Sequence, residues 1–103
     1  MQTASKRVRR IGKSYAHPLV VLIVAPSDEL ATRIGVIAGK WVGGAIERNR
    51  VKRLLRERLR ILQPTINKGF DIIFIARKPL LNSKQFEIQN AVETLLKRAD
   101  LIT

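Results

Sequence analysis

Two spacings of hydrophobic residues alternate along the 103-residue chain, and they predict where strands and helices lie. Residues 19–25, LVVLIVA, form a run rich in β-branched side chains between two prolines, which predicts a strand. Residues 33–39, RIGVIAG, predict a second strand, and we expect these two to pair as an antiparallel hairpin. Residues 70–76, FDIIFIA, predict a third strand, central in the sheet because both of its faces carry apolar residues.

A helical spacing begins after Gly44 and continues to about Leu62, and Pro64 ends the predicted helix. In a helical projection centred on Val51, one side is apolar and the other is basic. The apolar side consists of Val51, Leu54, Leu55, Leu59, Ile61 and Leu62. The opposite side carries Asn49, Lys52, Arg53, Arg56 and Arg60. This pattern predicts a helix that packs on a sheet and presents a basic side outward.

A last helix is predicted from residues spaced i, i+3, i+4 and i+7, with Asn82 or Ser83 as its N-cap. Its apolar positions are Ile88, Ala91, Val92, Leu95, Leu96 and Ala99. Residues 1–14 form a basic N-terminal segment, which is open to interpretation as a helix end, an arm or a disordered tail. We therefore expect residues 1–103 to form one small α+β domain, a two-layer sandwich with a short, mainly antiparallel sheet packed with helices.

The charge of the chain indicates what it binds. Twenty Lys and Arg against eight Asp and Glu give a net charge of +12, which repels itself unless a polyanion neutralises it. Nucleic acid is the leading candidate, and an anionic membrane surface is the second. The membrane is the weaker alternative, because the apolar side of the basic helix is needed to cover the sheet.

The basic helix differs from an ordinary solvated helix face. Between Arg48 and Arg60 the only acidic residue is Glu57, so opposite charges do not alternate at i, i+4. Arginine also suits bidentate contact with phosphate. Just upstream, Lys40 precedes Gly43 and Gly44, which form either a simple turn or a close approach to phosphate at the helix N-terminus.

The absence of cysteine excludes disulfides and thiolate metal sites and is typical of the cytoplasm, where we expect the protein to act. The longest apolar run, residues 19–25, is far below the roughly 20 residues that span a bilayer, so we expect no membrane-spanning segment, and no membrane is among the expected partners.

Catalysis by the polypeptide itself is not expected. Cleavage of RNA by two histidines needs a second imidazole, and His17 is the only histidine. The eight acidic residues do not converge by spacing into a metal site, and no phosphate-binding glycine loop is present. We predict no catalytic residue, no metal ligand and no small-molecule cofactor. The chain is typical of a binding protein.

The stretch GKWVGGAIERNRVKRLLRERLR resembles the signature of the protein component of bacterial ribonuclease P. The matching residues are Lys40, Gly43, Ala45, Arg48, Asn49, Arg50, Lys52, Arg53 and Arg56. Residues 71–79, DIIFIARKP, also resemble the third strand of that family, and the resemblance covers about residues 12–101.

The resemblance implies a subunit of an RNA enzyme that removes 5′ leaders from precursor tRNA, with Mg²⁺-dependent hydrolysis performed by the catalytic RNA. It implies that the catalytic RNA is bound by Lys40, Arg48, Asn49, Arg50, Lys52, Arg53, Arg56 and Arg60. A cleft between the sheet and an N-terminal helix takes the single-stranded leader, which here implies Tyr15, Val21 and Ile23. The family fold also has an unusual left-handed β-α-β crossover.

The chain departs from the family pattern at its N-terminus. Alignment on Gly12 places Ser5 and Arg9 where family members have two aromatic residues, and Tyr15 and Trp41 are the large aromatics nearby. A general or ribosomal RNA-binding protein of similar fold, acting as an RNA chaperone, is the alternative hypothesis. The Arg-Asn-Arg element favours the ribonuclease P subunit, and stimulation of leader cleavage separates the two.

Overall fold

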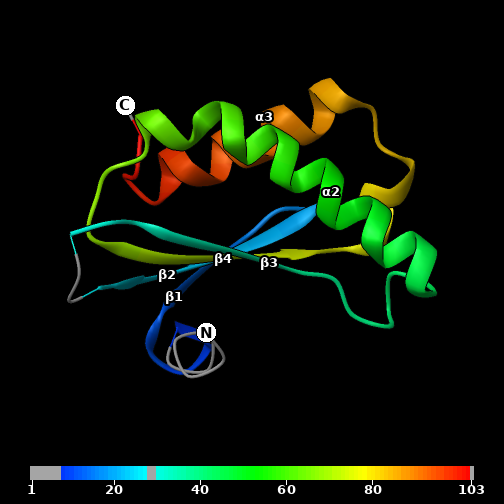
Figure 1. The fold of residues 1–103 in the computed structure, drawn as a ribbon, viewed down its shortest axis with the longest axis horizontal. Coiled ribbons are helices and arrows are strands. Elements are labelled where there is room, and N and C mark those ends of the chain that lie inside the picture. The colour runs from blue at the N-terminus through cyan, green and yellow to red at the C-terminus, as the bar shows by residue number, and fades with distance from the viewer. Residues whose placement is uncertain (1–7, 28–29, 103) are drawn as a thin grey trace.

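The computed structural model describes residues 8–27 and 30–102, which form a four-stranded sheet in the order β1-β2-β4-β3. The strands are β1 (Lys13–Ala16), β2 (Val20–Pro26), β3 (Arg33–Ile37) and β4 (Phe70–Ala76). The helices α2 (Ala45–Leu62) and α3 (Gln85–Arg98) cover one face, and the helical residues 8–11 lie on the other side of the sheet (Figure 1). Two short 3₁₀ helices follow α2 and β4, namely η1 (Gln63–Thr65) and η2 (Lys78–Asn82).

The predicted α+β class is confirmed, and so is the central position of β4, but the predicted hairpin is wrong. β2 and β3 do not pair with each other, because β4 lies between them, antiparallel to β2 and parallel to β3. β4 carries apolar residues on both faces, and in its central position other apolar residues pack on both of these faces. The crossover from β3 through α2 to β4 is the unit that the resemblance implies, and its left-handedness stays a prediction.

The strand β1 was not predicted. Its four residues, KSYA, lack a run of alternating apolar side chains, and three of them are exposed. The strand exists because it pairs antiparallel with β2, from Lys13 opposite Val24 to Ala16 opposite Val21. Part of the basic segment 1–14 is therefore ordered as a helix end and a strand. Residues 1–7 lie outside the described residues, as do Asp28 and Glu29 in the predicted turn.

The main core lies between the sheet and the two helices. It contains Val20, Leu22, Ile72, Phe74 and Ala76 from the sheet, Val51, Leu55 and Leu59 from α2, and Ile88, Ala91, Val92, Leu95 and Leu96 from α3. These helix residues confirm most of the two predicted apolar sides. Ile61 is an exception with 57% of its surface exposed, because it falls at the edge of the apolar arc in the last turn of α2. No helix within the described residues is long and apolar enough to cross a bilayer.

The predicted N-cap of α3 is wrong. Asn82 ends η2, and the Ser83 hydroxyl donates to the carbonyl of Pro79, so neither side chain is at the start of α3. Lys84 is the N-cap instead, and its backbone N–H donates to the Glu87 carboxylate at 2.8 Å. A carboxylate in the first turn satisfies an unpaired amide and interacts favourably with the helix dipole.

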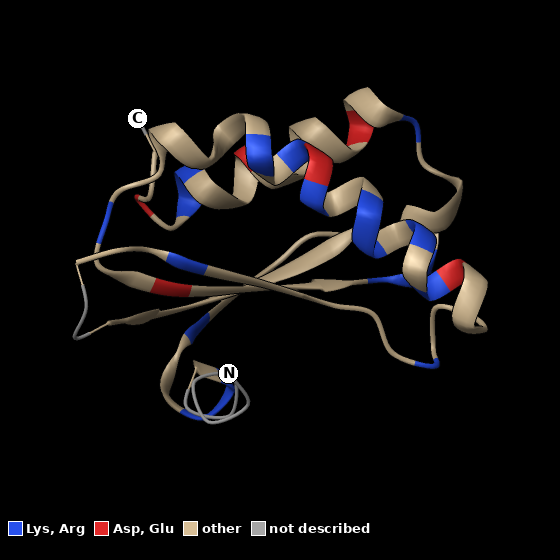
Figure 2. Ribbon diagram, viewed as in Figure 1, with Lys and Arg blue, Asp and Glu red and all other residues tan. Residues whose placement is uncertain are grey.

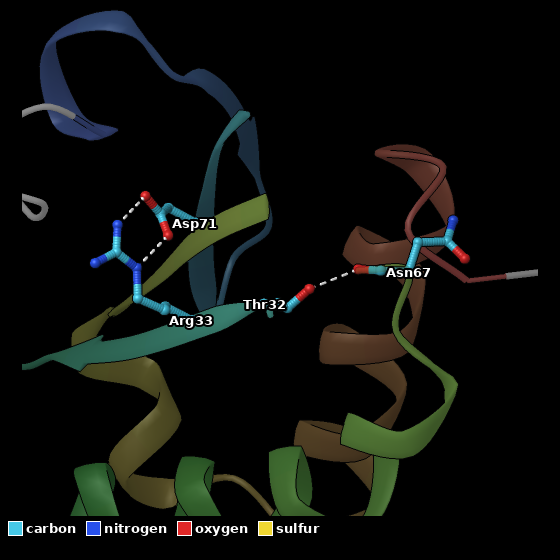
Figure 3. A network of polar contacts seen from close by, with 4 residues as sticks. All are labelled: Thr32, Arg33, Asn67 and Asp71. Atoms are coloured by element: carbon cyan, nitrogen blue, oxygen red, sulfur yellow. Dashed lines mark hydrogen bonds and ion pairs between the residues drawn. The ribbon is translucent and has the colours of Figure 1, made fainter. Parts of the chain in front are cut away.

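Hydrogen bonds link the start of β3 to the connection before β4, and that connection to the segment after α3 (Figure 3 shows the first of these contacts). The Thr32 hydroxyl donates to the backbone carbonyl of Asn67 at 2.7 Å. Asn67 in turn donates from its backbone N–H to the carbonyl of Leu101 and from its side chain to that of Asp100. The connection before β4 therefore holds the beginning of β3 and the end of α3 together.

Candidate nucleic-acid interface

The glycines before α2 set the geometry at the start of the helix. Gly43 has φ of +151°, and a Cβ there would lie 2.9 Å from the Cβ of Glu47, so a side chain is excluded on both grounds. The backbone N–H of Gly44 donates to the Glu47 carboxylate at 2.8 Å. This carboxylate satisfies one of the amides at the helix start and places a negative charge there, so the cations of α2 are the stronger candidates for phosphate contact.

Lysine and arginine recur along the length of α2 (Figure 2), and most of the predicted RNA-binding residues on this helix are exposed. The exposed residues are Asn49, Arg50, Arg53, Arg56 and Arg60. Arg48 and Lys52 are half-buried, and Lys40 is exposed in the turn that precedes the helix. The structure therefore brings seven of the eight predicted residues onto one helix, with the eighth immediately upstream.

The cations of α2 are not neutralised by carboxylates within residues 8–27 and 30–102. The ion pair found there joins Arg33 to Asp71, far from the outward side of α2. Glu57 is one helical turn from both Arg53 and Arg60 and forms an ion pair with neither. A row of unpaired cations on one rigid helix is suited to bind a chain of phosphates with release of counterions.

A second apolar surface lies on the face of the sheet opposite α2 and α3. Its buried members are Val8, Ala25 and Ile73, and half-buried Ile23, Ile37 and Ile75 pack against them. Val21 and Ile23 alternate with core residues on β2, so they point to this face, and both are half-buried. The structure thus brings together two of the three residues predicted for the leader.

Tyr15 does not belong to this surface. It is the register partner of Leu22, so its side chain lies on the helix side of the sheet and packs against the main core. The guanidinium of Arg98 in α3 lies 6.0 Å from the centre of its ring and donates to the carbonyl of Ala16 at 3.0 Å. The grouping of Tyr15 with Val21 and Ile23 is therefore wrong, because β1 alternates and places Tyr15 on the other face.

The N-terminal segment contributes an apolar contact that the sequence did not reveal. Val8 is 1% exposed and covers part of the second apolar surface. A Cβ at Gly12 would lie 2.4 Å from the Val8 carbonyl oxygen and 2.6 Å from a methyl of Ile23, so glycine permits this close return of the chain. Arg9 is exposed, and Ser5 lies outside the described residues. In the sequence, the only indication that Val8 is buried was that it is a single apolar residue among arginines.

Asp71 closes one end of the same face. It is 2% exposed, and its two carboxylate oxygens accept hydrogen bonds from Arg33 at 2.7 and 2.8 Å (Figure 3). The two residues are register partners on β3 and β4. A bidentate pair of this kind fixes the planar guanidinium beside the edge of the sheet.

His17 and the acidic residues are the other side chains that were weighed for chemistry in the sequence. His17 accepts a hydrogen bond at its Nδ1 from the backbone of Leu19 in the turn between β1 and β2. Within the described residues, no three His, Cys, Asp or Glu side chains converge as a metal ion requires.

Comparison with known proteins gives consistent matches over most of the chain. The family model for Ribonuclease P matches residues 3–100. The chain is 43% identical over 96 residues to the ribonuclease P protein component of Herpetosiphon aurantiacus, covering 93% of this chain and 78% of that protein.

Solved structures agree with the sequence matches. The RNase P protein of Staphylococcus aureus superimposes with a TM-score of 0.88 at 30% identity, covering all of this chain and 94% of that one. The RNase P protein of Thermotoga maritima superimposes with a TM-score of 0.82 at 30% identity, covering 91% and 89%. These matches do not favour a general or ribosomal RNA-binding protein.

Proposed function

The chain belongs to the ribonuclease P protein family, and on this premise we propose which of its surfaces meets each RNA. It is the protein subunit of a bacterial ribonucleoprotein endoribonuclease that processes tRNA. Two surfaces are available for RNA, the outward side of α2 and the sheet face opposite to it. They differ in chemistry, since the first is cationic and the second is apolar.

The outward side of α2 binds the catalytic RNA in this proposal. The observation that carries it is the set of cations on α2 without carboxylate partners among the described residues. Arg53, Arg56 and Arg60 are exposed on this side, and Lys40 extends it past the helix start. The apolar side of the same helix is buried against the sheet, so the cations are presented from a fixed position. Preorganised arginines reduce the entropy lost when phosphates are bound.

The sheet face with Val21 and Ile23 receives the single-stranded 5′ leader of precursor tRNA. Support comes from its half-buried side chains, which the two helices do not cover. Aromatic packing from Tyr15 is not part of the proposal, since that ring lies on the other face. The leader therefore packs against aliphatic side chains, with Arg9 and other N-terminal cations contributing charge.

The polypeptide supplies charge and position, and the RNA supplies the chemistry. Two RNA molecules repel each other at close range, and a chain with net charge +12 offsets that repulsion. We assign Mg²⁺ to the catalytic RNA, and we place the complex in the cytoplasm, where tRNA is made. RNA affinity falls steeply with salt. In a plot of the logarithm of the binding constant against the logarithm of the salt concentration, each phosphate neutralised contributes a slope of about −0.7 to −0.9.

Leader cleavage tests the function directly. A precursor tRNA is incubated with a bacterial ribonuclease P RNA at low Mg²⁺, with and without this protein. Strong stimulation is expected. Tight binding to the catalytic RNA without stimulation would contradict the assignment of the sheet face to the leader.

Removal of two exposed cations tests the α2 assignment. The double variant Arg53→Ala/Arg56→Ala should bind the catalytic RNA more weakly and lower the salt slope by about two, since each lost phosphate contact lowers it by about one. A matched control, Lys68→Ala/Lys97→Ala, removes the same charge from exposed positions outside α2. Equal weakening by the two double variants in a filter-binding titration would show that net charge matters and the face of α2 does not.

A further inference from the structure

Trp41 combines two properties that rarely occur together, since its side chain is largely exposed and yet fixed in place. It is 53% exposed in the connection between β3 and α2, which passes the C-terminal end of β4 (Figure 1). Its indole N–H donates to the carbonyl of Ala76, the last residue of β4, at 2.8 Å. The pairing of β3 with β4 ends at Ile75, so the indole satisfies a carbonyl beyond the last β3 partner.

One face of the six-membered ring of the indole rests on Gly39. A Cβ at that position would lie 1.9 to 2.4 Å from three carbons of the six-membered ring, so only glycine leaves room for it. The hydrogen bond from the indole N–H and the backbone contact against one face of the ring restrict rotation of the side chain, so the opposite face is the one that a second ring can cover. A ring held in this way loses little conformational entropy when a second ring stacks on it.

The surroundings of Trp41 are cationic. Lys40 precedes it, and Arg77 and Lys78 follow the carbonyl to which it is anchored; all three are exposed. The acid nearest in sequence is Glu47, and its carboxylate accepts the N–H of Gly44. An exposed aromatic ring among cations matches the general design of proteins that bind single-stranded nucleic acid.

A purely structural role would account for only part of this arrangement. A tryptophan that only closes the end of a sheet is stabilising to the extent that its ring is buried, and half of this ring is not. The geometry is therefore better suited to a ligand with a flat face.

We propose that Trp41 is a stacking platform for an unpaired nucleobase of RNA, with the adjacent exposed Lys40 available to a neighbouring phosphate. The inference rests on the proposed function, because it adds a further RNA contact next to the start of the helix that binds RNA. Stacking selects single strands over duplexes and is tolerant of base identity, since every base has a π-face.

Fluorescence tests the contact itself, because Trp41 is the only tryptophan of the chain. Single-stranded RNA at saturation should quench or shift its emission, and inorganic polyphosphate bound to the same cations should not. Binding is followed independently by the anisotropy of labelled RNA. Unchanged emission at saturating single-stranded RNA would overturn the proposal, as would an equal change with polyphosphate.

Two variants separate stacking from a structural role. Trp41→Phe and Trp41→Leu both lose the N–H that reaches Ala76 and both keep an apolar side chain, but only phenylalanine has a π-face. Relative to Trp41→Phe, Trp41→Leu should bind single-stranded RNA about fivefold to 150-fold more weakly. Equal affinities of the two variants, with equal thermal stability, would overturn the proposal.

The source of the base is found by two arms of the same titration. One arm uses the catalytic RNA alone, and the other uses a single-stranded oligonucleotide with the length of a leader. A response in either arm supports stacking and identifies which RNA supplies the base. If the protein stimulates leader cleavage while Trp41 responds in neither arm, the stacking proposal fails and the proposed function stands. Quenching by the oligonucleotide without stimulation of cleavage would leave stacking standing and remove the proposed function.

Discussion

The two faces of the sheet are formed by alternate residues of the same strands, but they are covered to different extents. On one face, Leu22 and Phe74 are completely buried under α2 and α3. On the other, Ile23 and Ile75 are half-buried, and the described cover there is Val8. The helix layer therefore holds the fold together, while the opposite face keeps apolar surface that a ligand can cover.

We call the face under α2 and α3 the closed face and the opposite face the open face. The largest effect on stability is expected from the closed face. Phe74→Ala should lower the free energy of unfolding by about 3–5 kcal/mol, because it opens a cavity at the centre of β4. Denaturant unfolding followed by circular dichroism measures it. Ile75→Ala, the neighbouring residue on the open face, is the control and should cost clearly less. Equal costs would show that the two faces contribute alike to stability.

An intermediate effect on stability is expected at the Arg33–Asp71 ion pair, which lies at one end of the open face. Arg33→Ala should cost about 2 kcal/mol of stability, because it removes two hydrogen bonds from the buried carboxylate of Asp71. Arg33→Lys keeps the charge and loses the bidentate geometry, so it should recover part of the loss. Thermal unfolding of the three proteins provides the measurement. No loss in Arg33→Ala would mean that the pair does not fasten β3 to β4.

The smallest effect on stability, but a specific effect on binding, is expected at Ile23. Ile23→Ser removes apolar area worth about 1 kcal/mol and should weaken binding of a single-stranded leader about fivefold. Tyr15→Leu is the matched control on the other face and should leave leader affinity unchanged. Fluorescence anisotropy of a labelled leader measures both. A larger loss in Tyr15→Leu than in Ile23→Ser would reverse the assignment of the faces.

Features that depend on nearby residues were predictable from the sequence. The helix α2 begins and ends where its glycines and Pro64 predict, and Val51, Leu55 and Leu59 are buried as its spacing requires. The outward position of the arginines follows from the same spacing, so this part of the candidate site was accessible without a structure. The runs that became β2 and β4 were likewise identified by local composition.

Features that depend on distant partners were not predictable. The strand β1 and the place of Tyr15 depend on pairing with β2, and the parallel pairing of β3 depends on β4, which lies 38 residues further along at Arg33 and Asp71. The helix α3 begins later than predicted because the Ser83 hydroxyl donates to the Pro79 carbonyl and does not cap the helix. Trp41 was noted as an aromatic, but its anchor on Ala76 is 35 residues away.

The position of β4 has a consequence for synthesis of the chain. β4 is the last of these four strands to leave the ribosome, and it lies in the sheet between β2 and β3. β2 ends at Pro26 and β3 at Ile37, which is 33 residues before β4 begins at Phe70. Until it emerges, β3 has no neighbouring strand, and α2 lacks much of the surface that buries its leucines. Completion of the sheet therefore depends on a late, long-range strand pairing. Before that pairing, the apolar side of the most basic helix is only partly covered in the nascent chain.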